Sequence, residues 1–512
     1  MTAHLGFDGR GVLSETNAEY ASYNVDASYN RGFFHIDFAN KNLRAAAASL
    51  APSTLRFGGS GNDYLSYSTR STPCTSGSDS DTFGCLNETH WAAFHGLAQY
   101  SGARFLFGVS YDLVKACDAR GSYRWNSSSA EAWLRYVRSQ NHTIWGFELG
   151  NEINNRRDKC SLNPEQQARA FHEFAAVVAR VYPEPGDRPV LVGPDVGYLD
   201  PETWLRGFLG NSSALQVPIR AVTYHVYPGI TRASFNDPAR LDSVQNDVRW
   251  YVPLVHRLAP GAEIWAGEDG PTGGGEDGTC GLQPPPGPAC GTYSTVLWYA
   301  DDMGQRMRGG FAQYQRQDLL GGRYGLLGIE HDNEMLSRSA TVTVQADFWV
   351  AFLWKRVMGT RVLNATLSDT FSRDGLGGGG HPMVRAYAAC GAPPSAHAPA
   401  PANVRGAVGV VVVNLHNGSS HSPPVQLALP ATARGASAWT LSPPAEGVFG
   451  RGALLNGLPL PGNFSTGDGV PIGAIPVPAV NVGHKGVLSL PPVSVTFLTI
   501  SGIAGLPRAC TA

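Results

Sequence analysis

Residues 144–152, Ile-Trp-Gly-Phe-Glu-Leu-Gly-Asn-Glu, form an apolar run that ends abruptly in the polar pair Asn151-Glu152. The run has the length and composition of a buried β-strand bounded by a turn. A carboxylate at the C-terminal end of such a strand is typical of (β/α)8 barrels, which carry their functional groups at that face. The stretch therefore predicts a barrel strand with Glu152 at its open end.

Seven further runs have the same strand-like character, and several of the segments between them allow helices, for example residues 90–100 and 164–181. The seven are residues 20–27, 53–57, 103–110, 189–195, 221–227, 263–268 and 310–317. Alternating strands and helices indicate a parallel sheet. Eight strands over about 310 residues are what a closed barrel requires. We predict an α/β fold, a (β/α)8 TIM barrel, over residues 19–358.

The character of the chain changes after a last expected helix at residues 347–357. Short alternating strands follow, such as 406–415 and 493–500, and they are separated by Pro/Gly clusters. This pattern predicts an antiparallel β-sandwich domain over residues 359–512. Residues 1–18 are too few for an independent unit, and we expect them to add a strand to that sandwich.

Length and charge limit the functional classes. A chain of 512 residues is too long for one ordinary core and favours two domains. The formal net charge of −2 argues against a nucleic-acid binder, and no apolar run reaches the roughly 20 residues of a membrane span. We expect a monomer without a membrane span.

Eight cysteines indicate an oxidising compartment, because their number is even and none forms a C-x-x-C pair. We predict sequential disulfides, Cys74–Cys85, Cys117–Cys160, Cys280–Cys290 and Cys390–Cys510; eight reduced thiols are the alternative. Seven N-x-S/T sites agree with a secreted/extracellular or lysosomal/vacuolar protein. No signal peptide opens the sequence, so we expect that it has been removed.

The run at 263–268 also ends in a carboxylate, Glu268. Glycosidic hydrolysis with retention needs one protonated carboxylic acid and one ionised carboxylate about 5–5.5 Å apart. We predict Glu152 as acid/base and Glu268 as nucleophile, with the higher pKa on Glu152 because its ionised neighbour disfavours a second charge. Taken singly, each glutamate also fits a solvated charge at a strand end.

Two neighbours extend the predicted site. Asn151 precedes the acid and projects from the other side of the strand end, where it can reach a sugar 2-OH. Tyr227 ends the strand at 221–227 and is placed to donate its hydroxyl to Glu268. Packing at the barrel rim is the alternative for Tyr227.

The ordered motifs of the chain resemble glycoside hydrolase family 79, the family of heparanase and related β-glucuronidases. The resemblance runs from about residue 20 to the end of the chain. The segments that carry it are Tyr23–Ala27, Leu55–Ser60, Trp125–Ser128, Phe147–Asn154, Trp265–Glu268 with Gly273–Gly275, Val357–Leu363, Leu455–Leu458, Cys390 and Cys510.

The resemblance implies a retaining β-glucuronidase that needs no metal or organic cofactor. It makes Glu152 the acid/base and Glu268 the nucleophile. It also implies a set of substrate-binding residues: Asp26, Asn151, Tyr227, Gly274, Gly275, Gln317 and Tyr324. Ser60 and His225 are further candidates for substrate binding. Backbone N–H groups of the two glycines and the tyrosine hydroxyl at 324 would hold the uronate carboxylate, since N–H dipoles can bind an anion. A merely flexible glycine loop is the alternative.

The basic clusters by which heparanase grips a sulfated chain are missing, and the loop at 66–81 is neutral to acidic. The basic group at 156–159 is read as a solvated loop, with contact to an anionic leaving group as the alternative. Asp269 is expected to point away from the pocket. The substrate is therefore expected to be a glucuronic-acid-containing glycan or glycoside, with exo action favoured. Alternatives are endo action on heparan sulfate, another sugar specificity, and a catalytically silent glycan-binding protein.

Overall fold

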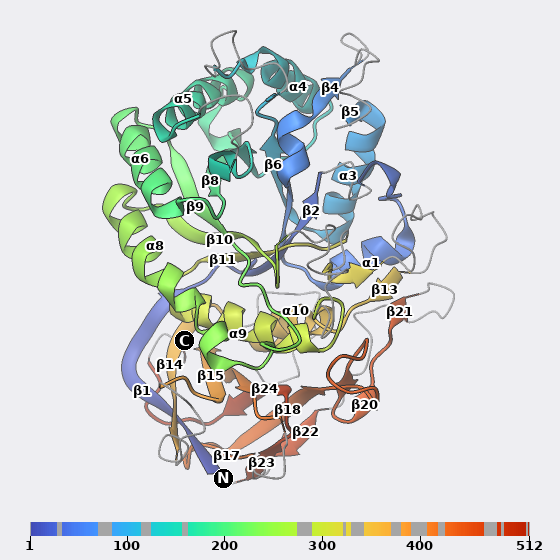
Figure 1. Cartoon of the computed structure of the whole chain (residues 1–512), viewed down its shortest axis with the longest axis vertical. Helices are drawn as coiled ribbons and strands as arrows, with labels where there is room; N and C mark the ends of the chain where they lie inside the picture. The colour runs from blue at the N-terminus through green and yellow to red at the C-terminus, as the bar shows by residue number, and fades with distance from the viewer. Residues whose placement is uncertain are drawn as a thin grey trace.

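The computed structural model comprises a barrel and a β-sheet domain stacked along the long axis of the molecule (Figure 1). Helices α9 (Ser294–Arg308) and α10 (Phe348–Val357) lie between the two. The residues that the structure describes are 2–27, 33–69, 84–113, 124–155, 162–273, 289–320, 324–328, 342–369, 380–390, 407–417, 425–464, 479–482, 486–507 and 510.

Eight parallel strands close into a barrel. In chain order they are β2 (Ala21–Asp26), β3 (Thr54–Gly58), β6 (Arg104–Val109), β7 (Gly146–Leu149), β8 (Val190–Val196), β9 (Ile219–Val226), β10 (Glu263–Asp269) and β11 (Gln313–Arg316). Each overlaps one of the eight runs expected from the sequence. The predicted (β/α)8 barrel is confirmed, and its C-terminal strand ends define one face.

The outer helices follow local sequence signals. They are α1 (Lys41–Ser49), α3 (Glu88–Ser101), α4 (Ser127–Ser139), α5 (Pro164–Val181), α6 (Pro201–Ala214), α7 (Pro238–Leu241) and α8 (Val244–Leu258). Helix α5 begins with Asn163 and Gln166 in a reciprocal capping box and has Pro164 at its first position. Phe171, Phe174 and Val178 repeat at helical spacing and bury one face of α5 against the barrel.

The second domain is one curled sheet of eleven strands. Its strands are β1 (Thr2–Glu15), β14 (Arg361–Asp369), β15 (Val384–Cys390), β16 (Val408–Asn414), β17 (Val425–Ala428), β18 (Gly435–Ser442), β19 (Leu454–Leu455), β20 (Leu458–Pro459), β22 (Val480–Val482), β23 (Val487–Leu490) and β24 (Ser494–Ser501). The first strand of the chain pairs with β14 and β17, so the N-terminal segment completes this sheet. Short strands β4 (Ser66–Ser68), β5 (Cys85–Asn87), β12 (Leu327–Gly328), β13 (Val342–Val344) and β21 (Asn463–Phe464) form two small sheets.

Strand β16 shows why the sheet is buried on both faces. Val408, Val410 and Val412 belong to a core enclosed by the curled sheet itself. Val411 and Val413 point the other way and join the large core that includes α9 and α10. Because side chains alternate along a strand, a run of valines can serve both cores at once.

Buried polar contacts join α9 to the sheet. The Arg385 guanidinium donates to Asp301 Oδ2 at 2.6 Å, and the Tyr387 hydroxyl donates to Asp301 Oδ1 at 2.6 Å. A Cβ at Gly304 would lie 2.2 Å from the Tyr387 ring, so glycine is required for this close approach. Asp301 of α9 thus takes its charged partner, Arg385, and a tyrosine hydroxyl from the sheet domain, which ties the two domains together.

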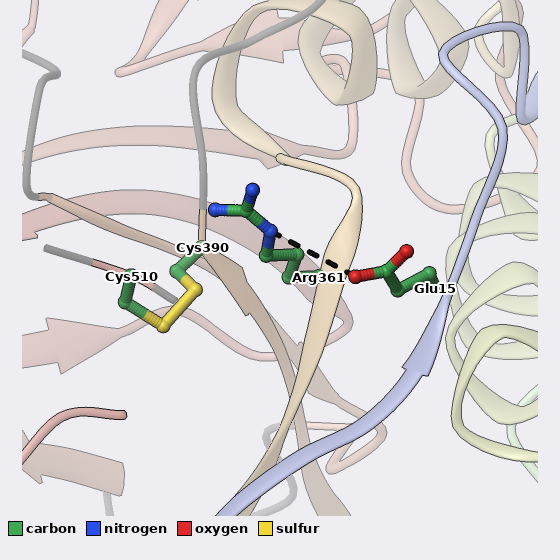
Figure 2. The surroundings of a disulfide bond; sticks show 4 residues. All are labelled: Glu15, Arg361, Cys390 and Cys510. Atoms are coloured by element: carbon green, nitrogen blue, oxygen red, sulfur yellow. Dashed lines mark ion pairs between the residues drawn. A yellow bond between two sulfur atoms is a disulfide. The ribbon is translucent and has the colours of Figure 1, made fainter. Parts of the chain in front are cut away.

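The predicted Cys390–Cys510 disulfide is formed, at the end of β15 (Figure 2). Glu15 and Arg361, paired at 3.8 Å, lie nearby and join β1 to β14. Cys85 and Cys290 are also disulfide-bonded. The other four cysteines, Cys74, Cys117, Cys160 and Cys280, lie outside the described residues. Within the described ranges, no helix has the length and apolar character that crossing a membrane would require.

We expect Asp301→Ala to lower the free energy of unfolding by about 3 kcal/mol, because it leaves the buried Tyr387 hydroxyl without its acceptor and Arg385 with Asp242, at 2.8 Å, as its remaining carboxylate partner. Glu202→Ala is the matched control, since Glu202 and Arg206 also pair at 2.6 Å but are about half exposed. Its cost should be at most about 1 kcal/mol. Urea unfolding of both variants measures the difference, and equal losses would contradict the interface role.

Candidate active site

The turn after β7 sets the position of Glu152. Gly150 and Glu152 both have positive φ, 77° and 48°. A Cβ at Gly150 would lie 2.9 Å from the Tyr111 ring. The Glu152 N–H donates to the Asp195 carbonyl at 2.8 Å, which anchors the turn to β8. A non-glycine residue in this conformation costs free energy and persists where the surroundings fix it, as happens most often at functional sites.

Glu268 lies near the end of β10, beside His225 of β9 in the strand register. A β-bulge separates it from Ala266, and bulges of this kind re-aim side chains into active sites. A Cβ at Gly267 would come within 2.8 Å of the Thr223 side chain, so the bulge needs glycine. The residue after Glu268, Asp269, turns away as expected and pairs with Arg306 of α9 at 2.6 Å.

The two predicted glutamates converge. One carboxylate oxygen each of Glu152 and Glu268, with one ring nitrogen of His225, lie within 4.8 Å of one another. The Glu268 side chain is 7% exposed and the Glu152 side chain 17%. This separation fits a retaining glycosidase, in which the two carboxyl groups lie about 5–5.5 Å apart. In an inverting glycosidase they lie about 6.5–9.5 Å apart.

Two donors hold the Glu268 carboxylate. Arg56 Nη1 contacts Glu268 Oε2 at 2.9 Å, and the Tyr227 hydroxyl donates to Oε1. Hydrogen bonds thus fix the position of both oxygens of this carboxylate. The structure thus places Tyr227 where the sequence analysis expected it.

Arg56 of β3 is the centre of a buried network that the sequence analysis missed. Its Nε contacts Glu148 Oε2 at 2.6 Å and its Nη2 donates to Asn151 Oδ1 at 2.9 Å. Its Nη2 also lies 3.4 Å from Asp195 Oδ2. A Cβ at Gly58 would come within 2.4 Å of the guanidinium, so the glycine leaves room for it. The signal in the sequence was a charged residue inside an apolar strand, in Arg56 as in Glu148.

Glu148 and Asp195 form a buried, hydrogen-bonded pair of carboxyl groups near Glu152 and Glu268. Burial raises the pKa of Glu148 well above its ordinary range, and the neighbouring Asp195 adds to this effect against the attraction of Arg56. Burial also opposes ionisation of Asp195, but Arg56 and His225 outweigh it and lower the pKa of that carboxyl. Of the two carboxyl groups, Glu148 therefore holds a proton more readily, and Asp195 ionises first.

His225 links this pair to Glu152. Its Nδ1 lies 3.0 Å from Glu152 Oε1 and its Nε2 lies 3.1 Å from Asp195 Oδ1. Burial alone would lower the pKa of His225, but Glu268, Asp195 and Glu152 raise it to about 10. The imidazole is therefore protonated at neutral pH and donates to both carboxylates.

Asn151 is held in place by Arg56, Gly59 and Asp63. Its Oδ1 accepts from Arg56 and from the Gly59 N–H at 3.2 Å, and its own N–H donates to Asp63 at 3.0 Å. Its buried Nδ2 meets no acceptor among the described residues. One amide donor of Asn151 thus remains for a ligand.

Two pairs of the predicted substrate-binding residues lie close together: Asp26 with Gln317, and Tyr324 with Tyr227. Gln317 Nε2 donates to Asp26 Oδ2 at 3.0 Å. The Tyr324 and Tyr227 rings lie 6.3 Å apart. Ser60 is the first residue of the 3-10 helix that follows Gly59, and it is exposed. The predicted contacts Gly274 and Gly275 lie outside the described residues.

Glu152, His225 and Glu268 also offer donor atoms of a metal site. However, both nitrogens of His225 face carboxylates, and a protonated imidazole is no ligand. The Glu268 oxygens are occupied by Arg56 and Tyr227. The donor set suits acid–base and nucleophilic chemistry better than metal binding.

The chain is similar to several known proteins. It is 25% identical over 368 residues to heparanase-like protein 3 from Arabidopsis thaliana, covering 69% of this chain and 64% of that protein. It is 25% identical to baicalin-beta-D-glucuronidase from Scutellaria baicalensis, covering 66% and 65%. Bos taurus heparanase is 26% identical over 82% of this chain and 78% of that protein. The chain thus spans just under two thirds of the first two relatives.

Solved structures share the fold at low identity. The GH51 arabinofuranosidase from Xanthomonas axonopodis pv. citri has a TM-score of 0.67 and 12% identity, with 98% of this chain and 100% of that chain covered. A 4-O-alpha-L-rhamnosyl-beta-D-glucuronidase from Fusarium oxysporum has a TM-score of 0.64 and 12% identity, covering 98% and 100%. The sequence profile of the glycosyl hydrolase family 79 N-terminal domain matches residues 16–304, more than half of the chain. The chain belongs to glycoside hydrolase family 79.

Proposed function

We propose that the chain is a retaining β-glucuronidase that releases β-linked glucuronic acid from glycans or glycosides. The observation that carries the proposal is the convergence of Glu152 and Glu268 within 4.8 Å at the C-terminal face of the barrel. Membership in the family and the names of relatives, baicalin-beta-D-glucuronidase and heparanase, support the choice of glucuronide.

The two glutamates perform a double displacement. Glu268 attacks the anomeric carbon while Glu152 donates its proton to the leaving oxygen, which breaks the glycosidic bond and forms a glycosyl ester. Glu152 then removes a proton from water, and the resulting hydroxide displaces Glu268 with retention. Tyr227 and Arg56 hold the Glu268 carboxylate in position before attack and after release.

The remaining polar atoms fit a sugar bound between these groups. Asn151 Nδ2 and Gln317 Oε1 are buried and find no partner in the described part of the chain. One offers a donor and the other an acceptor, as ring hydroxyls require. A hydrogen bond from Asn151 to the 2-OH would strengthen as the oxocarbenium-like transition state forms.

Specificity for the uronate is assigned to Tyr324, with the backbone of Gly274 and Gly275 as further donors. Exo action is preferred over endo action because the sequence lacks large basic clusters for a sulfated chain. From the Cys390–Cys510 disulfide we infer an oxidising compartment, secreted/extracellular or lysosomal/vacuolar. We also propose that the enzyme is a monomer.

Wild-type protein should hydrolyse an aryl β-glucuronide and leave the matching β-glucoside almost untouched. Glu268→Gln should reduce kcat by several orders of magnitude, because the amide is neutral and cannot act as the nucleophile. Chromogenic release measures both. Turnover of the glucoside instead would assign another sugar specificity, and internal cleavage of heparan sulfate without aryl turnover would assign endo action.

Glu152→Ala should affect substrates according to their leaving groups. A phenol of low pKa leaves without protonation, so its glycosylation rate should change little. An alkyl or sugar leaving group should lose about 10²–10⁴-fold, the usual contribution of general acid catalysis. Single-turnover rates across a series of leaving groups check this, and a uniform loss would remove Glu152 from the acid role.

His225 should keep its proton from pH 5 to 8, because its pKa is raised to about 10. Its NMR ring signals, identified by their loss in His225→Gln, should stay at imidazolium positions over that range. Since the folded pKa exceeds the usual 6.5, protonation stabilises the fold fully below pH about 6.5, and this stabilisation is lost as pH rises toward 10. The variant should therefore show a flatter decline of stability with pH. A titration midpoint near 6.5 would contradict the charged network.

A further inference from the structure

Tyr198 is the most exposed of the large apolar and aromatic side chains in the described residues, at 75%. It follows β8, which ends at Val196, and so lies at the barrel face that carries Glu152 and Glu268. A single exposed aromatic side chain is ordinary on a protein surface, but one at the face that carries the site offers a flat apolar surface on which a ligand ring can stack.

The backbone around Tyr198 is held in place on both sides. The Gly197 N–H donates to Asn154 Oδ1 at 2.8 Å, and Asn154 Nδ2 donates to the carbonyls of Gly197 and Leu199 at 3.1 and 2.7 Å. The Leu199 N–H donates to Asn155 Oδ1 at 2.9 Å. A Cβ at Gly197 would lie 2.1 Å from the Asn155 amide, so the loop also needs glycine there. The tyrosine projects from a fixed loop, which lowers the entropy lost on binding a ligand.

The same contacts bring Tyr198 close to the acid. Asn155 Nδ2 donates to Glu152 Oε2 at 2.8 Å, while its Oδ1 receives the Leu199 N–H. One amide group therefore bridges the Glu152 carboxylate and the residue beside Tyr198. Two hydrogen bonds and the amide between them keep the Tyr198 backbone within roughly 10 Å of that carboxylate. The acid protonates the leaving oxygen, so this is the leaving-group side of the bond.

We propose that Tyr198 is a stacking platform for the group attached to the glucuronic acid, and that this group is an uncharged ring with a flat apolar face. The inference rests on the proposed function and adds the class of leaving group. Aromatic glycosides and unsulfated sugars share the required face, and both can stack on a tyrosine ring.

Charge on the loop favours an uncharged ring. Asp200 and Glu202 follow the tyrosine at once, and Glu202 is already paired with Arg206 at 2.6 Å. Because Arg206 balances Glu202, a sulfated leaving group would meet like charge mainly at the Asp200 carboxylate. The basic residues at 156–159 lie outside the described residues, and a sulfated substrate in the experiment tests their opposite influence.

Three glucuronides that differ in the leaving group test the proposal: a two-ring aryl glucuronide, an unsulfated glucuronyl oligosaccharide, and methyl glucuronide, which has no ring to stack. Tyr198→Ala should raise KM about 5- to 10-fold for substrates with a ring, as loss of about 1–1.4 kcal/mol of stacking requires. Methyl glucuronide should be unaffected, and Tyr198→Phe should behave as wild type. An effect on only one of the two ring substrates identifies the source of the ring.

Tyr100→Ala is the matched control. Tyr100 is 58% exposed near the end of α3 and precedes β6, at the opposite face of the barrel, so its loss should change no KM. The platform would be overturned if Tyr198→Ala affected all three substrates equally or affected none of them. It would also be overturned if a 6-O-sulfated oligosaccharide were turned over faster than the unsulfated one and Tyr198→Ala left that rate unchanged. Absence of wild-type turnover on every glucuronide would instead overturn the proposed function itself.

Discussion

The ion pairs of Arg56 are the constraint on which the site depends. A fully buried guanidinium is costly unless several acceptors surround it; here Asp195 and Glu268 supply the opposite charge, and Glu148 accepts a hydrogen bond from Nε. Attraction from these carboxylates outweighs burial and raises the pKa of Arg56 well above its ordinary range. Because the acceptors come from three other strands, the barrel must close correctly before the charge is satisfied. The closed barrel and the position of Glu268 thus depend on the same buried contacts.

Much of this arrangement was predictable from the sequence. The eight strand runs and the ends at Glu152 and Glu268 follow from apolar patterning, which is local information. The sandwich-like domain was predictable from alternating strands, and the capping box of α5 from Asn163, Pro164 and Gln166. A closed barrel brings all strand ends to one face, so the convergence of two glutamates required only the fold class.

What the sequence could not supply was the pairing between strands. Arg56 and Glu148 each stand in an apolar run, but which carboxylates face which guanidinium depends on barrel register and on the bulge before Glu268. Only the structure shows that Asn154 and Asn155 hold the Tyr198 loop next to Glu152. Long-range side-chain contacts of this kind leave no periodic trace along the chain.

The count of charges explains how these contacts would serve the proposed reaction. Arg56 and His225 carry two positive charges, and Asp195 and Glu268 balance them once Glu148 keeps its proton. In the proposed reaction Glu152 is the carboxyl group that carries the transferred proton. When Glu152 gives up that proton, the positive character that develops on the sugar compensates the new anion, and His225 already donates to it. The net charge of the buried pair Glu148–Asp195 therefore stays constant during the proposed reaction. Charge moves only between the sugar and the two glutamates Glu152 and Glu268.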